Sequence, residues 1–230
     1  MKIGILETGH VPEGLAEKHG TYPDMFSRLL EGHGLAFETY TVVDGQFPKS
    51  VHDCDGWLIT GSRHGAYEPH AWIPPLEEFI RKAYGAGVPL VGICFGHQIM
   101  AQALGGKVVK FSGGWGVGPV EYRTTGGATY QLHAMHQDQV VEKPPEAEVI
   151  ASSEHCEYAG FAYKGKAISF QPHPEFSTGY MRDLIEARKG KVIPPEQADN
   201  ALAKTGRQTD DASIAAQIVE FFRQSVRKAA

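Results

Sequence analysis

The sequence predicts an α/β fold built on a mostly parallel sheet, and three observations support this prediction. Short apolar strands alternate with amphipathic helices through the first hundred or so residues. Such alternation is typical of parallel sheets joined by right-handed crossovers. After Lys107 the pattern changes to short strands separated by turn residues such as Gly126-Gly127, which indicates antiparallel hairpins. Between these regions, the apolar run at 90–93 ends on a cysteine flanked by glycines, as at the site-bearing end of a central strand.

The expected elements follow from apolar spacing and from turn residues. In the first half we expect strands at 3–6, 37–43, 56–60 and 90–93, and helices at 24–31, 74–84 and 98–104. In the second half we expect strands at 108–111, 119–122, 128–132, 148–151, 160–163 and 167–170, and helices at 179–188 and 212–227. The polar stretch 189–211 is expected to be a surface loop that can include a helical turn. With no linker or repeat in view, residues 1–230 are expected to form one domain.

Composition narrows the classes of function. The 42% hydrophobic and 21% charged content of the 230 residues is typical of a globular protein. A formal net charge of −5 gives no basic surface for nucleic acid. No apolar run approaches the ~20 residues of a membrane-spanning helix, so we expect no membrane partner. Three widely spaced cysteines argue against a disulfide framework, and a cytoplasmic location is expected.

Residues 92–96 (Gly-Ile-Cys-Phe-Gly) predict a nucleophile elbow, a sharp turn between a strand and a helix. Small residues two before and two after the nucleophile permit this turn, which lifts the side chain out of the sheet. We expect the helix to begin at His97, and its positive N-terminal end favours a thiolate at Cys94. Cys94 is therefore the candidate nucleophile. Cys54 and Cys156 lack flanking glycines and are expected to be unreactive.

A histidine between two prolines follows the strand expected at 167–170. The prolines favour an extended backbone, so His173 and Glu175, two residues apart, project to the same face. The carboxylate can then reach one ring nitrogen while the other faces a nucleophile. We predict a catalytic triad of Cys94, His173 and Glu175. A different kind of cysteine enzyme, in which the acid of the triad comes before the elbow in the sequence, is disfavoured, because Glu175 comes two residues after His173.

The two motifs together resemble those of the class I glutamine amidotransferases, in particular free-standing members similar to the glutaminase domain of GMP synthase. The resemblance covers nearly the whole chain, including the order of the three residues and their roughly eighty-residue gap. It implies an α/β fold with a doubly wound, mostly parallel (mixed), flavodoxin-like sheet flanked by helices, and a smaller antiparallel strand region. It also implies hydrolysis of the glutamine side-chain amide. Because the chain shows no ATP motif, a partner synthase subunit would accept the ammonia.

The resemblance implies a role for each motif residue. Cys94 would attack the amide carbon and form a γ-glutamyl thioester, His173 would transfer protons, and Glu175 would orient the imidazole. The oxyanion would be bound by the backbone N–H of Phe95 and by the loop at Gly61, where Gly-Ser replaces the family's usual Gly-Gly.

Four further residues match positions that contact the small-molecule substrate in the family: Gln98, Gly116, His136 and Gln137. The segment 135–138 (Met-His-Gln-Asp) is expected to be a loop and differs from the family's common Ser-His-Gly-Asp form, which bears on amino-acid specificity. Trp115, in a glycine-rich loop, can line the site.

Eleven histidines raise the question of a metal site. His133 and His136 are three residues apart, and His64 and His70 are six apart. No cysteine or carboxylate joins either pair at a ligand spacing, so neither a metal nor a cofactor is expected.

Two other functions remain open. The same triad can hydrolyse γ-glutamyl peptides, where an amino acid leaves in place of ammonia, and the room beyond the scissile amide would decide between them. Alternatively, the chain is a non-catalytic binding or regulatory module that keeps the fold.

Overall fold

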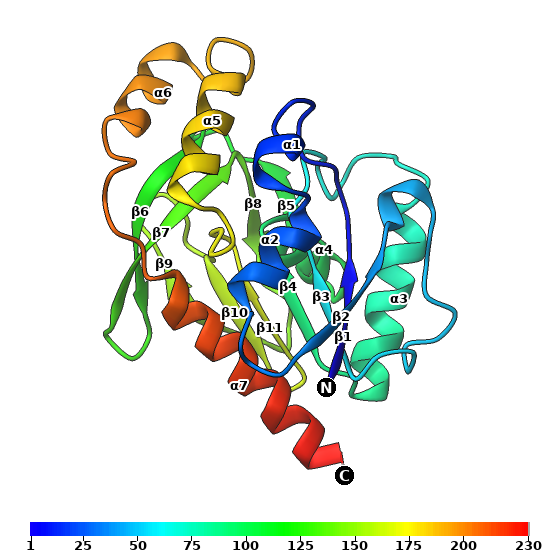
Figure 1. The fold of residues 1–230 in the computed structure, drawn as a ribbon. Helices are drawn as coiled ribbons and strands as arrows, with labels where there is room; N and C mark the ends of the chain where they lie inside the picture. Colours follow the sequence, from blue (N-terminus) through cyan, green and yellow to red (C-terminus); the bar gives the residue numbers. More distant parts are fainter. Residues whose placement is uncertain (230) are drawn as a thin grey trace.

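A computed structural model of the chain describes residues 1–229. Within these residues a nine-stranded sheet, in the order β2-β1-β3-β4-β11-β10-β9-β6-β7, lies between layers of helices (Figure 1). A second sheet pairs β5 with β8. The predicted mixed sheet flanked by helices, with a smaller antiparallel part, is confirmed.

The strands are β1 (Lys2–Leu6), β2 (Ala36–Tyr40), β3 (Gly56–Ile59), β4 (Leu90–Ile93), β5 (Lys107–Lys110), β6 (Gly116–Thr124), β7 (Thr129–His136), β8 (Asp138–Glu142), β9 (Ala147–Ser152), β10 (Gly160–Tyr163) and β11 (Ala167–Phe170). The helices are α1 (Ala16–His19), α2 (Tyr22–Leu29), α3 (Ile73–Ala86), α4 (Phe95–Ala103), α5 (Thr178–Arg188), α6 (Pro195–Leu202) and α7 (Asp211–Ala229).

The sheet order brings the two sequence motifs together. From β2 to β11 each strand pairs in parallel with its neighbour, and from β11 to β7 the pairing is antiparallel. β4, which leads to Cys94, pairs in parallel with β11, which leads to His173, with Ile93 opposite Phe170. The carboxyl ends of parallel neighbours lie at one edge of a sheet, so the two motifs meet there.

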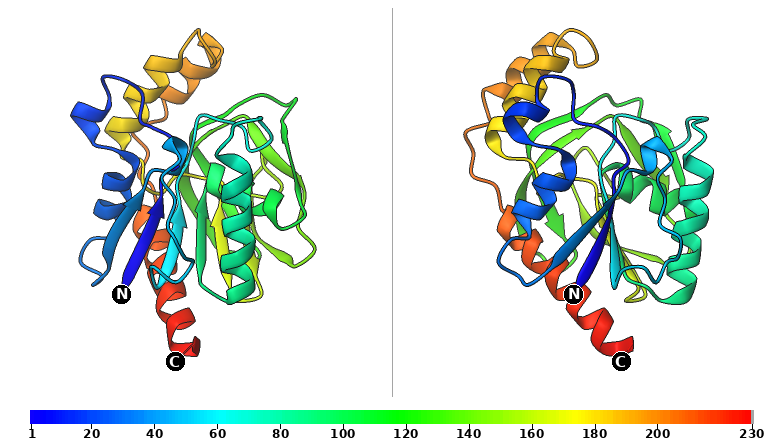
Figure 2. Two further views of the ribbon diagram at one scale, coloured as in Figure 1. Left: turned by 90° about the vertical axis from the view of Figure 1, so that its right-hand side faces the viewer. Right: turned by 45° about the vertical axis from the view of Figure 1, so that its right-hand side comes forward.

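Apolar side chains cover both faces of the sheet, as continuous apolar strands require. α3 and α4 pack on one face, and α2 and α7 pack on the other (Figures 1 and 2). The first layer contains Leu76, Ile80, Ile99 and Met100, all fully buried. Burial of a side chain of this size stabilises the fold by about 1.5–3 kcal/mol.

Local sequence signals set the ends of several helices. Thr21 and Asp24 form a reciprocal capping box at the start of α2. Prolines occupy the first turn of α3, where their missing N–H groups cost nothing, and Gly87 ends the helix with φ +74°. None of the helices in residues 1–229 is long and apolar enough to cross a membrane.

Several expected boundaries are wrong. The strand expected at 37–43 ends at Tyr40, because Val42–Asp44 forms a 3-10 turn closed by Gly45. The strand expected at 128–132 runs to His136, so the segment 135–138 is a tight junction between β7 and β8. In the stretch 189–211 the helical turn that the sequence allowed is longer than one turn, because Pro195–Leu202 forms the two-turn helix α6. α4 begins at Phe95, two residues before the expected start.

Candidate active site

The turn at Cys94 has the sharp geometry that its flanking glycines predict. Cys94 adopts φ +53°, a region that costs a non-glycine residue about 1–3 kcal/mol. A Cβ added at Gly92 would lie 2.5 Å from the carbonyl oxygen of Gly96, and one added at Gly96 would lie 2.3 Å from that of Ile59. Neither position has room for a side chain, so this turn requires glycine two residues before and two residues after Cys94.

Neighbouring strands hold the turn in place through backbone hydrogen bonds. The N–H of Cys94 donates to the carbonyl of Phe170 in β11 at 2.8 Å. The N–H of Gly96 donates to the carbonyl of Thr60, after β3, at 3.1 Å. Cys94 is the N-cap residue of α4, so its sulfur lies at the positive end of the helix dipole.

His173 and Glu175 form the buried pair that the sequence predicts. Nδ1 of His173 lies 2.7 Å from Oε1 of Glu175, and both side chains are almost fully enclosed. Phe176 stacks on the imidazole at 3.9 Å between ring centroids, and the N–H of His173 donates to the carbonyl of His133 at 2.8 Å. The carboxylate and the stacked phenyl ring therefore fix the imidazole, and the backbone bond to His133 holds the main chain that carries it.

The protonation of His173 follows from these neighbours. Burial lowers the pKa of this imidazole, but Cys94 and Glu175 outweigh burial and raise it above its ordinary value. A hydrogen bond from Nδ1–H to Glu175 leaves Nε2 for the sulfur of Cys94. The imidazole of His173 is therefore favoured in its charged form beside Cys94.

Gly61 lies against both groups. A Cβ added at Gly61 would be 3.0 Å from Cε1 of His173 and 3.7 Å from Cβ of Cys94. A side chain at this position would press on the histidine ring, so the close approach of the loop favours glycine here. The loop after β3 therefore reaches the position at which an oxyanion donor is expected, and Phe95 takes up the first helical position on the other side.

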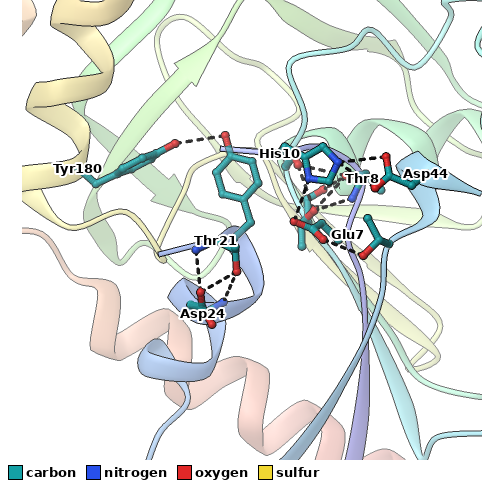
Figure 3. A network of polar contacts seen from close by, with 11 residues as sticks. Glu7, Thr8, His10, Thr21, Asp24, Asp44 and Tyr180 are labelled. Atoms are coloured by element: carbon teal, nitrogen blue, oxygen red, sulfur yellow. Dashed lines mark hydrogen bonds and ion pairs between the residues drawn. The ribbon is translucent and has the colours of Figure 1, made fainter. Parts of the chain in front are cut away.

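Thr8, which the sequence analysis missed, holds this loop. Its hydroxyl lies 2.9 Å from the carbonyl oxygen of Thr60 and 3.1 Å from that of Gly61. Its N–H donates to Oγ1 of Thr60 at 3.0 Å. Figure 3 shows Thr8 beside Glu7, at the end of β1, where His10 and Asp44 continue the polar network. The sequence signal for Thr8 is its place two residues after β1, at the edge where parallel sheets carry their sites.

A cleft of about 450 Å³ opens over Cys94, within the usual size range of small-molecule sites. Gln98, His136 and Gln137, which the sequence analysis matched to substrate contacts, line it, and so does Trp115. The side-chain amide of Gln98 donates to the carbonyl of Asp138 at 2.9 Å, and this bond holds the Gln98 side chain in the wall of the cleft. Burial lowers the pKa of His136 to about 3, so it faces the cleft uncharged.

Gly116, in contrast, does not line the cleft. It pairs with His136 across β6 and β7, and a Cβ there would lie 3.1 Å from Nε2 of His136. Its absent side chain makes room for that ring.

Basic residues, which sequence reasoning also missed, dominate the charge of the cleft. Four cationic side chains line it: Arg63, Lys110, Arg188 and Lys191. Two carboxylates, Glu68 and Asp138, lie among them, which leaves an excess of two positive charges in a chain of net charge −5. The four cations come from the loop after β3, from β5 and from the end of α5, so no local motif signals them.

Two further expectations from the sequence concern the reactivity of the other cysteines and the surroundings of the histidine pairs. Burial raises the pKa of Cys54, and it raises the pKa of Cys156 to about 12, which agrees with their expected lack of reactivity. The expectation that no carboxylate joins His64 and His70 is wrong. Glu68 lies with them, and all three ligand atoms are within 4.8 Å of one another.

Comparison with known proteins fits this geometry. Residues 29–189 match the family model for glutamine amidotransferase class-I. Gamma-glutamyl peptidase 4 of Arabidopsis thaliana is 32% identical over 206 residues, which cover 83% of this chain and 80% of that protein. A GMP synthase (glutamine-hydrolyzing) of Caldicellulosiruptor saccharolyticus is 36% identical over 177 residues, 73% of this chain and 34% of the synthase.

A solved structure agrees on the fold. The glutamine amido transferase from Methylobacillus flagellatus superposes with a TM-score of 0.76 at 22% identity, covering 99% of this chain and 94% of that one. The chain belongs to the class I glutamine amidotransferase family. Its relatives include amidotransferases and peptidases, which supports an enzyme of this broad kind.

Proposed function

We propose that this protein hydrolyses γ-glutamyl amide bonds with Cys94 as the nucleophile. The observation that carries the proposal is the convergence of three groups at one sheet edge. Cys94 forms the floor of the cleft on a strained turn, His173 lies beside it, and Glu175 holds the imidazole at 2.7 Å. This is the arrangement of a nucleophile, a base and an orienting acid.

The reaction then proceeds in two steps. The Cys94 thiolate attacks the amide carbon, and the oxyanion accepts hydrogen bonds from the N–H of Phe95 and from the loop at Gly61, each worth about 3 kcal/mol of barrier. The imidazolium of His173 donates its proton to the departing amine, and the C–N bond breaks to leave a γ-glutamyl thioester. Water, deprotonated by His173, attacks the thioester, and glutamate leaves as the thiol regains its proton.

The charge of the cleft favours a γ-glutamyl peptide as the substrate. Glutamine carries one carboxylate and one ammonium group, whereas a γ-glutamyl dipeptide carries a second carboxylate on its leaving amino acid. The positive excess supplied by Arg63, Lys110, Arg188 and Lys191 suits the second carboxylate. Similarity to a gamma-glutamyl peptidase over four fifths of both chains supports the same choice.

Glutamine is the second candidate substrate, supported by the 36% identity with a GMP synthase. In that case ammonia is the leaving group, and a synthase partner would accept it. The GMP synthase match spans 34% of the synthase, so this chain resembles only part of that enzyme.

The test compares turnover of L-glutamine with turnover of γ-glutamyl-glutamate, whose leaving group adds two carboxylates. Each hydrolysis of the dipeptide releases two glutamates and each hydrolysis of glutamine releases one, so the glutamate measured with the dipeptide is halved. We expect a higher kcat/KM for the dipeptide. A double Arg188→Gln, Lys191→Gln variant should lose most of that preference. Lys82→Gln, which neutralises an exposed lysine of α3 outside the cleft, is the matched control.

Other outcomes separate the alternatives. Preference for glutamine, unchanged in the double variant, would make the protein a glutaminase. No glutamate release from either substrate by folded protein would favour the non-catalytic module.

A further inference from the structure

The loop between β3 and α3 gathers three metal-ligating side chains at the mouth of the cleft. Nε2 of His70 lies 2.7 Å from Oε2 of Glu68, and Nδ1 of His64 lies 3.6 Å from the same oxygen. Two backbone hydrogen bonds shape this part of the loop, from Glu68 N–H to the Gly65 carbonyl and from His70 N–H to the Glu68 carbonyl. The three groups thus converge through the loop's own turn.

The spacing suits a small divalent ion. Zinc binds imidazole nitrogens and carboxylate oxygens at about 2.0–2.2 Å, so tetrahedral ligand atoms stand roughly 3.4 Å apart. The contacts to the Glu68 oxygen bracket that value, and all three ligand atoms lie within 4.8 Å. Small side-chain rotations are enough to bring them to ligand distances. The side chains are a fifth to two fifths exposed, which lets an ion enter from solvent.

We propose that His64, Glu68 and His70 form a binding site for one divalent transition-metal ion of the zinc class. Two imidazoles and one carboxylate are ligands that such ions accept, and calcium and magnesium prefer all-oxygen sites. Three protein ligands leave one coordination position open to water or to a ligand in the cleft, which His64 and Glu68 both line.

An ion here is connected to the reaction centre by rings in contact. His70 stacks on Trp72 at 6.0 Å between centroids with an angle of 15°, and Trp72 packs against Phe95 at 5.4 Å. Phe95 follows Cys94 directly. The ion would also tie down the loop that begins at Gly61. We therefore expect it to stiffen this wall of the cleft and to add positive charge at its mouth.

The test is calorimetric titration of untagged, chelator-treated full-length protein with Zn²⁺, and separately with Mg²⁺. We expect one Zn²⁺ per chain and no comparable Mg²⁺ binding. Glu68→Gln and His70→Ala should each weaken Zn²⁺ binding by at least roughly tenfold, since even residues that only orient ligands are worth that much. His52→Ala, which removes an exposed histidine outside the cluster, should bind as tightly as the wild type.

Two controls keep the result decisive. Circular dichroism confirms that each variant is folded, and Glu68→Gln keeps the shape of the side chain if His70→Ala does not fold. Titration with Co²⁺ should give the intense visible absorption of a four-coordinate site in wild type and a weaker band in Glu68→Gln. Absence of stoichiometric Zn²⁺ binding, or equal affinity in Glu68→Gln and wild type, would overturn the proposal. Binding is measured without substrate, so it is independent of the proposed hydrolase activity.

Discussion

Oε1 of Glu175 lies 2.7 Å from Nδ1 of His173, with both side chains buried and Phe176 stacked on the imidazole. The carboxylate therefore fixes the tautomer of the ring and favours its charged form. Glu175→Gln keeps the size of the side chain but removes its charge. We expect kcat to fall by roughly 10²–10⁴-fold while KM changes little, because the lost interaction is strongest once the imidazolium forms.

Steady-state kinetics on the γ-glutamyl dipeptide measure kcat and KM separately, and Glu175→Asp is the comparison that keeps the charge. An equal loss in kcat and in substrate affinity would contradict the role of Glu175 as the orienting acid.

Thr8 provides a test of the loop that carries Gly61. Thr8→Val keeps the shape of the side chain but removes the hydroxyl that contacts the carbonyls of Thr60 and Gly61. The Thr60 carbonyl keeps the Gly96 N–H as a donor and the Gly61 carbonyl keeps the Thr60 hydroxyl, so the loss is that of one ordinary hydrogen bond, about 0.5–1.5 kcal/mol, and the loop can relax from its position. We expect a roughly tenfold lower kcat, less than the loss of a whole oxyanion donor. Thr8→Ser should restore most of the rate, and a Thr8→Val enzyme with wild-type kcat would show that Thr8 does not position the loop.

The backbone at Cys94 predicts an unusual order of stabilities. Glycine is ordinarily less stable than alanine by roughly 0.5–1 kcal/mol within regular structure, because it loses more conformational freedom on folding. At φ +53° an alanine is strained and a glycine is not. We expect Cys94→Gly to be at least as stable as Cys94→Ala, as measured by urea unfolding. A Cys94→Gly variant less stable by the ordinary glycine cost would contradict the strained turn.

Three buried histidines predict a loss of stability in acid. Burial lowers the pKa of His97 and of His136 to about 3, and burial together with His173 lowers that of His133 to about 4. In the unfolded chain these groups titrate near 6.5. Below about pH 6.5 these histidines bind protons in the unfolded state but stay neutral in the native state. As the pH falls, the free energy of unfolding therefore decreases by up to about 1.4 kcal/mol per pH unit for each group.

The loss should continue until the pH reaches the folded pKa values, near 3 to 4. His173 acts in the opposite sense: its raised pKa gives stability that is complete below about 6.5 and lost as the pH rises through the folded pKa. Urea unfolding at several pH values between 5 and 7.5 measures the net slope. His97→Gln, which can keep a donor to the Tyr158 carbonyl, should reduce that slope by about one proton. An unchanged slope would show that His97 titrates normally in the native state.

Much of the fold could be predicted because its signals are local. β4, β10 and β11 have the expected bounds, since each is a short apolar run closed by turn residues. The turn at Cys94 and the contact between His173 and Glu175 also follow from neighbours in sequence: two glycines that no side chain can replace, and two prolines that extend the backbone.

The rest depends on segments that meet only in the folded chain. Arg188 and Lys191 reach the cleft from the end of α5, and Lys110 reaches it from β5. Glu68 joins His64 and His70 through a turn of the loop that has no helical or strand spacing. Hydrophobic periodicity reports which face of an element is buried, and these contacts lie in loops and at element ends, where that signal is absent.

The most direct test of the central claim is to locate the acyl group on the enzyme. Wild-type protein is mixed with γ-glutamyl-glutamate, quenched in acid and digested, and the peptides are analysed by mass spectrometry, with glutamate release measured in parallel for Cys94→Ala. We expect a one-glutamyl mass increase on the peptide that contains Cys94, and no glutamate release by Cys94→Ala. A glutamyl group on another residue, or undiminished glutamate release by Cys94→Ala, would contradict the assignment of Cys94 as the nucleophile.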